Sequence, residues 1–462
     1  MKQIIRIFLF LGFSNILLGQ SFSNGAFNTY ILCENGIPMA CGANNTGQLG
    51  LGYSDNNDHF TFTAYTNLSG ITAISGGHTS VFFLKNDGTV WGTGSNQDGR
   101  LGLDISVFSI TEPIQIPGLT DIVAISTGIA NSFFLKNDGT VWGCGKNFDG
   151  ELGLGHTNPQ YGVIQMPGLS DVVAISNGSY HSMFLKNDGT VWGTGANGAG
   201  QLGINSNLAR ATTPVQVLIS NVTAIATGYL HSIFLKDDGS AWVCGTNMHG
   251  ELGNGGATPN SRSPIQVNGV SDIVSIHTSG VSYNSMFLKN DGTVWQCGGN
   301  ELGNFGSGAM VSSNVVFMNT LINDINYLST NGYHTVFLKN DGTLWSAGGN
   351  ISGQLGVYAE NSVSTPIQIP ITCAVLDNEN QELAQENLFL YPNPSQGIVH
   401  LSKKLRQSCY FTLYSTLGQE LFSEILNLDT ERIDISKNAS GIYYYTLKFE
   451  NGFTSNGKII IE

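Results

Sequence analysis

Charged residues are scarce in this chain. They make up 11% of its 462 residues, whereas roughly 25% is typical of soluble proteins. Coiled coils and helical solenoids need abundant Glu, Lys and Leu, so this composition excludes both. Basic residues are the scarcer kind, with 19 Lys and Arg against 33 Asp and Glu. Proteins that bind nucleic acid present clustered Lys and Arg to the phosphates, so we expect no nucleic-acid partner.

Long apolar runs are missing after the first twenty residues, which read MKQIIRIFLFLGFSNILLGQ. Lys2 and Arg6 precede an apolar core over 7–18, which is too short to cross a bilayer, since a spanning helix needs about 20 residues. This pattern predicts a secretory signal peptide over 1–19, with a buried N-terminal strand as the alternative. We therefore expect an exported mature chain without a transmembrane segment.

Glycine, by contrast, is abundant, at 59 residues, and hydrophobic residues at 41% are too many for a disordered chain. Six near-identical segments of the type FLKNDGTVWGTG recur every 50 to 53 residues, and a diverged seventh copy, YILCENGIPMACG, precedes them. They occupy 30–42, 82–94, 133–145, 183–195, 233–245, 286–298 and 336–348.

Each copy predicts four short strands, with Asn-Asp-Gly as the hairpin turn between the second and the third. Four strands per ~50 residues, repeated seven times, predict an all-β, seven-bladed β-propeller over 20–376. A linear solenoid is the alternative architecture, but it needs polar capping repeats, and the sequence shows none.

The repeat resembles that of the regulator of chromosome condensation family. Ser179 to Gly203 shows the pattern, with His181, Trp192 and the Gln201-Leu202-Gly203 segment at the family's positions. The first copy departs from it because Met39 replaces Trp, and the sixth departs because CGGNELG (297–303) reads as a shortened loop. The resemblance implies the propeller fold and, from the founding member, guanine-nucleotide exchange on an intracellular GTPase.

The first copy lacks an IVAIS-like first strand, and an orphan run at 372–376 follows the last copy. We therefore predict that 372–376 supplies this strand and closes the ring. In the resulting hairpin Cys33 would face Cys373, within reach of a disulfide in an oxidising compartment. Two free thiols are the alternative.

The repeat ends at an acidic linker, 377–386, and a small antiparallel β-sandwich is predicted over 387–462. This segment resembles the type A C-terminal sorting domain of the type IX secretion route of Bacteroidota. The residues that carry the resemblance are Tyr391, Pro392, Asn393, Pro394, Gly441 and Tyr443. It implies contact with the type IX secretion machinery and a secreted or cell-surface protein that passes through the periplasm.

Catalytic motifs are missing from the sequence: it has no G-x-S-x-G, H-E-x-x-H or P-loop. We assign His78, His181, His231 and His334 to one repeat position in the sequence, which other copies fill with Asn. This exchange favours a hydrogen bond that fixes a turn over a ring of metal ligands. We expect no enzyme activity, cofactor or metal.

One face of the ring carries variable loops with aromatic residues, which are enriched in binding hot spots. The candidate binding residues there are Phe148, Tyr161, Tyr180, Tyr229, Tyr283 and Tyr333. Packing over blade edges or the central channel is the alternative role for them. The leading hypothesis is a module that binds a protein or glycan outside the cell. Inhibition of a secreted enzyme is a second hypothesis, and guanine-nucleotide exchange, which the acidity and the export signals oppose, is a third.

Overall fold

The computed structural model describes residues 21–33, 36–65, 67–256, 260–359 and 361–371, and in the C-terminal region 390–391, 395–401, 408–415, 419–428, 430, 432–449 and 454–461. The chain divides into two compact units, Met1–Cys373 and Ala374–Glu462.

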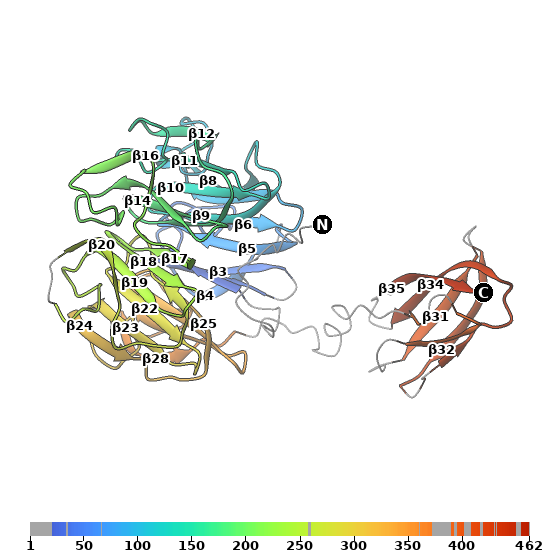
Figure 1. Cartoon of the computed structure of the whole chain (residues 1–462). Helices are drawn as coiled ribbons and strands as arrows, with labels where there is room; N and C mark the ends of the chain where they lie inside the picture. Colours follow the sequence, from blue (N-terminus) through green and yellow to red (C-terminus); the bar gives the residue numbers. More distant parts are fainter. Residues whose placement is uncertain are drawn as a thin grey trace. The chain divides into compact units, whose positions relative to one another are not determined.

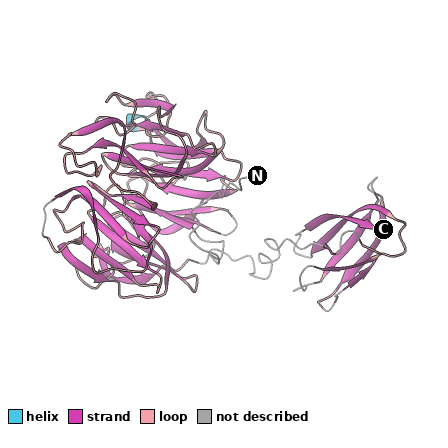
Figure 2. Ribbon diagram, viewed as in Figure 1, coloured by secondary structure: helices cyan, strands magenta, loops and turns pink. Residues whose placement is uncertain are grey.

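The first unit is a ring of four-stranded antiparallel sheets, seven in the part of 21–371 that the structure describes (Figure 1). Strand is the prevailing structure (Figure 2), beside the short helix η1 (Gln97–Gly99). The all-β propeller is thus confirmed. The first blade consists of β1 (Ser21–Asn24), β2 (Asn28–Leu32), β3 (Pro38–Ala43) and β4 (Asp58–Ala64). The second consists of β5 (Ile71–Gly76), β6 (Ser80–Lys85), β7 (Val90–Ser95) and β8 (Ser109–Gln115). The third consists of β9 (Ile122–Thr127), β10 (Asn131–Lys136), β11 (Val141–Gly145) and β12 (Gln160–Gln165). The fourth consists of β13 (Val172–Asn177), β14 (His181–Lys186), β15 (Val191–Ala196) and β16 (Arg210–Gln216). The fifth consists of β17 (Val222–Thr227), β18 (His231–Lys236), β19 (Ala241–Thr246) and β20 (Asn260–Gln266). The sixth consists of β21 (Ile273–His277), β22 (Asn284–Lys289), β23 (Val294–Asn300) and β24 (Val311–Asn319). The seventh consists of β25 (Ile325–Thr330), β26 (His334–Lys339), β27 (Leu344–Gly349) and β28 (Ser362–Gln368).

The Asn-Asp-Gly turns form by local chemistry. In the second blade Asp87 Oδ1 accepts hydrogen bonds from Thr89 N at 2.9 Å and Thr89 Oγ1 at 2.6 Å. Gly88 has φ = 77°, a left-handed conformation that glycine adopts without strain. The same hydrogen bonds recur at Asp138, Asp188, Asp238, Asp291 and Asp341.

The predicted ring closure by 372–376 is wrong. The inner strand of the first blade is β1, which pairs antiparallel with β2 from Ser21↔Leu32 to Asn24↔Thr29. Each blade is therefore one continuous stretch of chain. The segment SFSN was missed because its alternation is too short and too polar to resemble IVAIS, whereas pairing with β2 needs only backbone groups.

The ring closes where β1 and β2 meet β25 and β26 of the last blade. Asn24 Nδ2 donates to Ser329 O at 2.8 Å, and Thr29 Oγ1 donates to Gln354 O at 2.6 Å. Phe22 and Ile31 pack with residues of the last blade in a shared apolar cluster that includes Val336 and Leu344. Side chains, rather than an exchanged strand, hold the first and last blades together.

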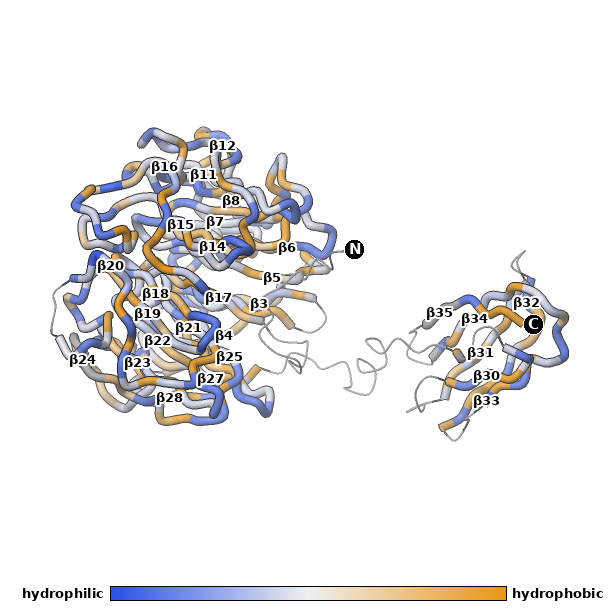
Figure 3. The backbone as a smooth tube through the Cα atoms, in the orientation of Figure 1, coloured by the Kyte–Doolittle hydropathy of each residue, from blue (hydrophilic) through white to orange (hydrophobic). Residues whose placement is uncertain are grey.

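Packing between blades follows one repeated scheme. Apolar residues of the second and third strands of one blade cluster with those of its neighbour, as Phe133 and Val141 do with Phe184. Figure 3 shows the corresponding recurrence of hydrophobic stretches along the strands. Small polar residues on these strands donate to a carbonyl of the preceding blade's long loop. Ser232 Oγ and Cys244 Sγ, for example, reach Gln201 O at 2.8 and 3.4 Å.

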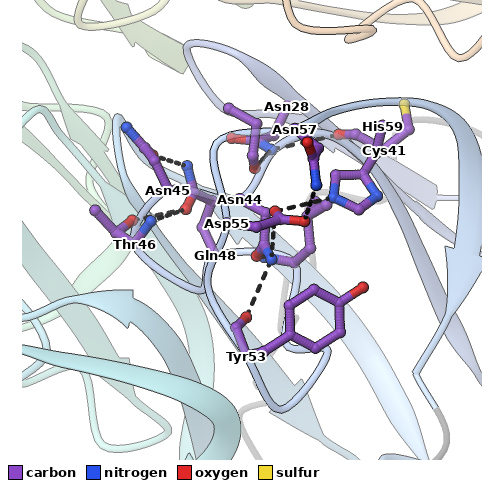
Figure 4. A network of polar contacts seen from close by, with 12 residues as sticks. Asn28, Cys41, Asn44, Asn45, Thr46, Gln48, Tyr53, Asp55, Asn57 and His59 are labelled. Carbon is purple, nitrogen blue, oxygen red and sulfur yellow. Dashed lines mark hydrogen bonds and ion pairs between the residues drawn. The ribbon is translucent and has the colours of Figure 1, made fainter.

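A buried asparagine holds each long loop between third and fourth strands. In the first blade Asn44 Oδ1 accepts from Leu49 N at 3.2 Å, and its amide donates to Tyr53 O at 3.0 Å and Asp55 Oδ1 at 3.2 Å (Figure 4). In the sixth blade Asn300 Oδ1 accepts from Phe305 N at 2.9 Å in the same way. The sixth loop is therefore complete and not shortened, because Asn300 and Phe305 fill the positions of Asn44 and Leu49.

The C-terminal unit is built from two antiparallel sheets, ordered β29-β30-β33 and β32-β31-β34-β35. The strands are β29 (Leu390–Tyr391), β30 (Ile398–Leu401), β31 (Cys409–Tyr414), β32 (Glu420–Leu426), β33 (Arg432–Asp434), β34 (Gly441–Phe449) and β35 (Thr454–Ile461). Buried residues from both sheets, among them Val399, Phe411 and Ile459, form one core. This arrangement agrees with the predicted sandwich.

Candidate binding site

Strand order gives the propeller two unlike faces. We call the loop face the one formed by turns between first and second strands and by long loops between third and fourth strands. The other face carries the Asn-Asp-Gly turns. There lysines extend over the rings of tryptophans, with Nζ 4.8–6.0 Å from the ring centroid, at Lys85–Trp91, Lys136–Trp142, Lys186–Trp192, Lys236–Trp242 and Lys289–Trp295. These pairs repeat from blade to blade, so variation between blades concentrates on the loop face.

Three of the six predicted residues meet on the loop face. Tyr180, Tyr229 and Tyr283 come from the turns of three successive blades, where each precedes a second strand. The Tyr180 and Tyr229 hydroxyls lie 3.1 Å apart and their ring centroids 5.3 Å apart, in an edge-on arrangement. The Tyr229 and Tyr283 centroids lie 4.7 Å apart. Their mutual hydrogen bond is the main cause that raises the pKa of Tyr180 to about 12. We refer to these three residues as the tyrosine cluster.

Lys146 extends the tyrosine cluster toward the third blade. Its Nζ lies 4.3 Å from the centroid of the Tyr180 ring, 5.9 Å from that of Phe148 and 3.4 Å from Glu151 Oε1. Phe148 is half exposed, and its carbonyl oxygen accepts a hydrogen bond from Arg210 at 2.9 Å. At the other end of the tyrosine cluster, the ring centroids of His249 and Tyr283 lie 4.8 Å apart. Sequence reasoning missed Lys146, although other copies carry only small residues at its position.

Of the remaining two predicted aromatics, Tyr333 lies close enough to Tyr283 to add to the effect of burial in raising the pKa of Tyr283, whereas Tyr161 lies elsewhere. Tyr333 stacks on Phe27 of the first blade with centroids 5.3 Å apart, and Phe27 also meets His78 edge-on at 5.8 Å. Tyr161 lies on β12 beside Gly99 of the neighbouring blade and is 41% exposed. The structure therefore separates Tyr161 from the tyrosine cluster.

The turn of the sixth blade, 278–283, reaches across to other blades. Sixteen residues separate the strand partners Ile273 and Lys289, against fourteen for Val172 and Lys186, so this turn is two residues longer than that of the fourth blade. Its Gly280 carbonyl accepts a hydrogen bond from Ser179 Oγ, and its Ser282 carbonyl accepts one from Tyr229 N at 3.0 Å. The turn thus places Tyr283 against residues of two other blades.

The histidines have a structural role. His181 Nε2 contacts Ser232 Oγ at 2.8 Å, and His334 Nε2 contacts Thr29 Oγ1 at 2.7 Å, in each case across a junction between blades. Burial lowers the pKa of His181 to about 3, and it lowers that of His334 to about 3 as well. His78 does not share their position, because Ser80 is the residue that pairs with Gly94 as His181 pairs with Gly195.

Five cysteines, Cys41, Cys144, Cys244, Cys297 and Cys409, are buried free thiols. Cys33 is disulfide-bonded. Cys373 lies outside the described residues, so the pairing of these two stays a prediction. Among the described residues no group of three or more His, Cys, Asp or Glu is arranged to hold a metal ion.

The sorting residues lie in the C-terminal unit. Tyr391 belongs to β29, and Pro392, Asn393 and Pro394 lie outside the described residues. Gly441 begins β34, and on the same strand Tyr443 donates its hydroxyl to Ala439 O at 2.6 Å. In the part of the chain that the structure describes, no helix has the length and apolar character to cross a membrane.

The chain forms a ring of antiparallel four-stranded blades, and a buried asparagine hydrogen-bonds the backbone of each long loop. These features define a β-propeller of the chromosome-condensation type. The RCC1-like domain model matches residues 111–385, more than half of the chain, so this chain belongs to the RCC1-like domain family. The model of the secretion system C-terminal sorting domain matches 389–462. The chain is therefore a secreted or cell-surface propeller protein, as the sequence predicted.

Curated relatives match only in part. The probable E3 ubiquitin-protein ligase HERC6 of Homo sapiens is 34% identical over 140 residues, which is 29% of this chain and 14% of the relative. The regulator of chromosome condensation of Xenopus laevis is 30% identical over 139 residues, 28% of this chain and 31% of the relative. The chain thus spans less than a third of the length of either.

Solved structures agree on the fold. Prp20p of Saccharomyces cerevisiae has a TM-score of 0.64 at 20% identity, covering 74% of this chain and 88% of Prp20p. Human WBSCR16 has a TM-score of 0.60 at 22% identity, covering 68% of this chain and 85% of WBSCR16. At this level of identity the likeness establishes the propeller fold alone.

Proposed function

We propose that this protein is a non-catalytic binding module that recognises a protein or glycan outside the cell through its loop face. The observation that carries the proposal is the tyrosine cluster. Three blades contribute one tyrosine each to a continuous aromatic surface, and Tyr283 is 38% exposed. Tyrosine provides a large contact area at a small cost in conformational entropy, and its hydroxyl gives hydrogen bonds to a polar ligand.

Exposed apolar side chains on the long loops also support the loop face as the contact surface. Phe108, Met248 and Tyr358 are 81%, 79% and 80% exposed, and each belongs to a long loop of a different blade. Phe, Tyr and Met are among the residue types enriched at protein interfaces. Because these loops belong to the same face as the tyrosine cluster, a large partner would contact both.

Guanine-nucleotide exchange is the function that family analogy offers, and a secretion-regulating guanine nucleotide exchange factor of Bos taurus is 30% identical over 145 residues. Exchange needs an intracellular GTPase, whereas the sorting domain directs this chain out of the cell. Inhibition of a secreted enzyme remains a form of the proposed binding, in which the partner is an enzyme. The identity of the captured partner separates inhibition from adhesion.

The test compares Tyr229→Ala with Tyr161→Ala in the full chain. Both variants delete the same side chain, but only Tyr229 belongs to the tyrosine cluster. Each protein is immobilised and exposed to surface material of the producing cells and to a glycan array. We expect Tyr229→Ala to weaken capture at least about tenfold, as hot-spot truncations do, and Tyr161→Ala to leave it unchanged. Equal capture by the two variants would contradict the assignment of the site.

A further inference from the structure

Two junctions between blades on the loop face are built alike. One joins the third blade to the fourth and holds Glu151 and Tyr180; the other joins the fifth to the sixth and holds Glu251 and Tyr283. The register equates the tyrosines, because each precedes the residue that pairs with a glycine near the end of the third strand: His181 with Gly195, and Asn284 with Gly298.

The two carboxylates are held in the same way. Glu151 Oε2 accepts a hydrogen bond from Asp149 N at 2.8 Å, and Glu251 Oε2 accepts one from His249 N at 2.8 Å. Both glutamate side chains are fully buried. In both junctions one carboxylate oxygen is therefore satisfied inside its own loop, and the second oxygen distinguishes the junctions.

In the first junction a lysine neutralises the second oxygen. Lys146 Nζ lies 3.4 Å from Glu151 Oε1 and 4.3 Å from the centroid of the Tyr180 ring. The ammonium group is placed between a buried carboxylate and an aromatic ring, two groups that attract cations by charge and by the quadrupole of the ring.

In the second junction Thr246 stands where Lys146 stands in the first. Glu151 Oε1 and Glu251 Oε1 are both buried and accept no hydrogen bond from any described residue, and Thr246 Oγ1 is buried without one too. The junctions differ because Glu151 has the ion pair with Lys146, which Thr246 cannot supply to Glu251. A buried carboxylate oxygen without a partner is costly, and the cost is recovered when a cation approaches it.

We propose that the junction between the fifth and sixth blades binds a primary ammonium group, supplied by a lysine side chain of the partner. The ammonium takes the place beside Glu251 and Tyr283 that Lys146 takes beside Glu151 and Tyr180. The proposal rests on the proposed function, since it names the chemistry of the partner at one end of the tyrosine cluster. Tyr283 is 38% exposed, and its ring contacts that of His249, which belongs to the loop that holds Glu251.

The probe is Nα-acetyl-lysine amide, and Nα-acetyl-norleucine amide, which lacks the ammonium group, is its control. Each is titrated into the full chain and followed by NMR. Glu251→Gln removes the charge and preserves the loop, since Gln48, Gln201 and Gln354 fill the same position in other blades. Thr246→Lys supplies the ammonium from the chain itself, as at Lys146. Unfolding curves check that both variants fold.

We expect the lysine probe to bind and the norleucine probe not to bind. We expect Glu251→Gln and Thr246→Lys each to weaken binding by about tenfold or more, as loss of one member of a buried charge pair does. Lys146→Ala should create a second binding site for the probe beside Glu151. Equal affinity in the parent chain, Glu251→Gln and Thr246→Lys would overturn the proposal, and so would the absence of binding to the parent chain.

Failure of this site is distinguishable from failure of the proposed function. If Glu251→Gln and Thr246→Lys capture surface material as well as the parent chain does, while Tyr229→Ala does not, the binding face stands and the ammonium site is refuted. If the lysine probe binds as expected but Tyr229→Ala captures material normally, the ammonium site stands and the role of the tyrosine cluster is refuted.

Discussion

Thr29 offers a direct test of how the ring closes. Its hydroxyl has one hydrogen, which it donates to Gln354 O at 2.6 Å, so His334 Nε2, 2.7 Å away, must carry the hydrogen of the second bond. Thr29→Val removes the hydroxyl but keeps the shape of the side chain. The second blade already has Val81 at this position, buried and part of a core cluster, so the substitution suits the fold.

The expected loss follows from the groups left behind. His334 Nε2–H becomes a buried donor without its partner, and among the described residues Gln354 O keeps the long contact with Cys41 Sγ at 3.8 Å. Each unsatisfied buried group costs about 1–3 kcal/mol, so we expect Thr29→Val to lower the free energy of unfolding by about 2–4 kcal/mol.

Ser232→Ala is the matched control, because Ser232 makes the same two contacts at an internal junction, with His181 Nε2 and Gln201 O, both at 2.8 Å. Denaturant unfolding measures both losses, which should be similar. Hydrogen exchange distinguishes the two variants: Thr29→Val should speed exchange in the first and last blades, because these two blades are not consecutive in the chain. A cost below about 1 kcal/mol, or the same exchange pattern for both variants, would refute closure by these side chains.

Three further predictions concern pH, export and the cysteines. Burial lowers the pKa of His181, His231 and His334 to about 3, 4 and 3, so between pH of about 6.5 and these values the unfolded chain binds protons that the folded chain does not. The free energy of unfolding should therefore fall as pH drops from about 6.5 to about 4. Replacing all three with Asn, which other blades have at this position, should make the free energy of unfolding, measured with urea, depend less on pH across that range. Deleting 387–462 should trap a folded propeller in the periplasm, and fractionation that finds it outside the cell would count against the sorting role. Peptide mapping without reductant should recover Cys33 joined to Cys373, whereas separate alkylated peptides would remove that link.

Much of the architecture was predictable because its signals are local. An Asn-Asp-Gly turn is set by the Asp side chain and the left-handed glycine within four residues, so each hairpin appears in the sequence independently of its neighbours. Seven copies of such a unit imply a ring, and the sorting domain carries its own motif. The fold and the destination of the chain were thus correctly predicted.

The candidate site was only partly predictable because its contacts depend on how the ring of blades curves and brings distant turns together. Tyr180, Tyr229 and Tyr283 lie about fifty residues apart in sequence, and the ring brings their side chains together. It leaves Tyr161, which was predicted to lie on the same face, apart from them. Lys146 carries a signal, a lysine among small residues, but its partners Glu151 and Tyr180 become evident only when the two blades are packed.

By itself the sequence determined the blades, their number and the export of the chain, since hairpin turns, strand alternation and sorting motifs act over short distances. Only the tertiary structure decided how the ring closes and which side chains meet across its junctions. The strand at Ser21–Asn24 is specified by backbone pairing, which leaves little trace in residue type. The exchange of Lys146 for Thr246 changes the electrostatics of a junction only because packing places each residue in a junction that also holds a buried carboxylate, Glu151 or Glu251.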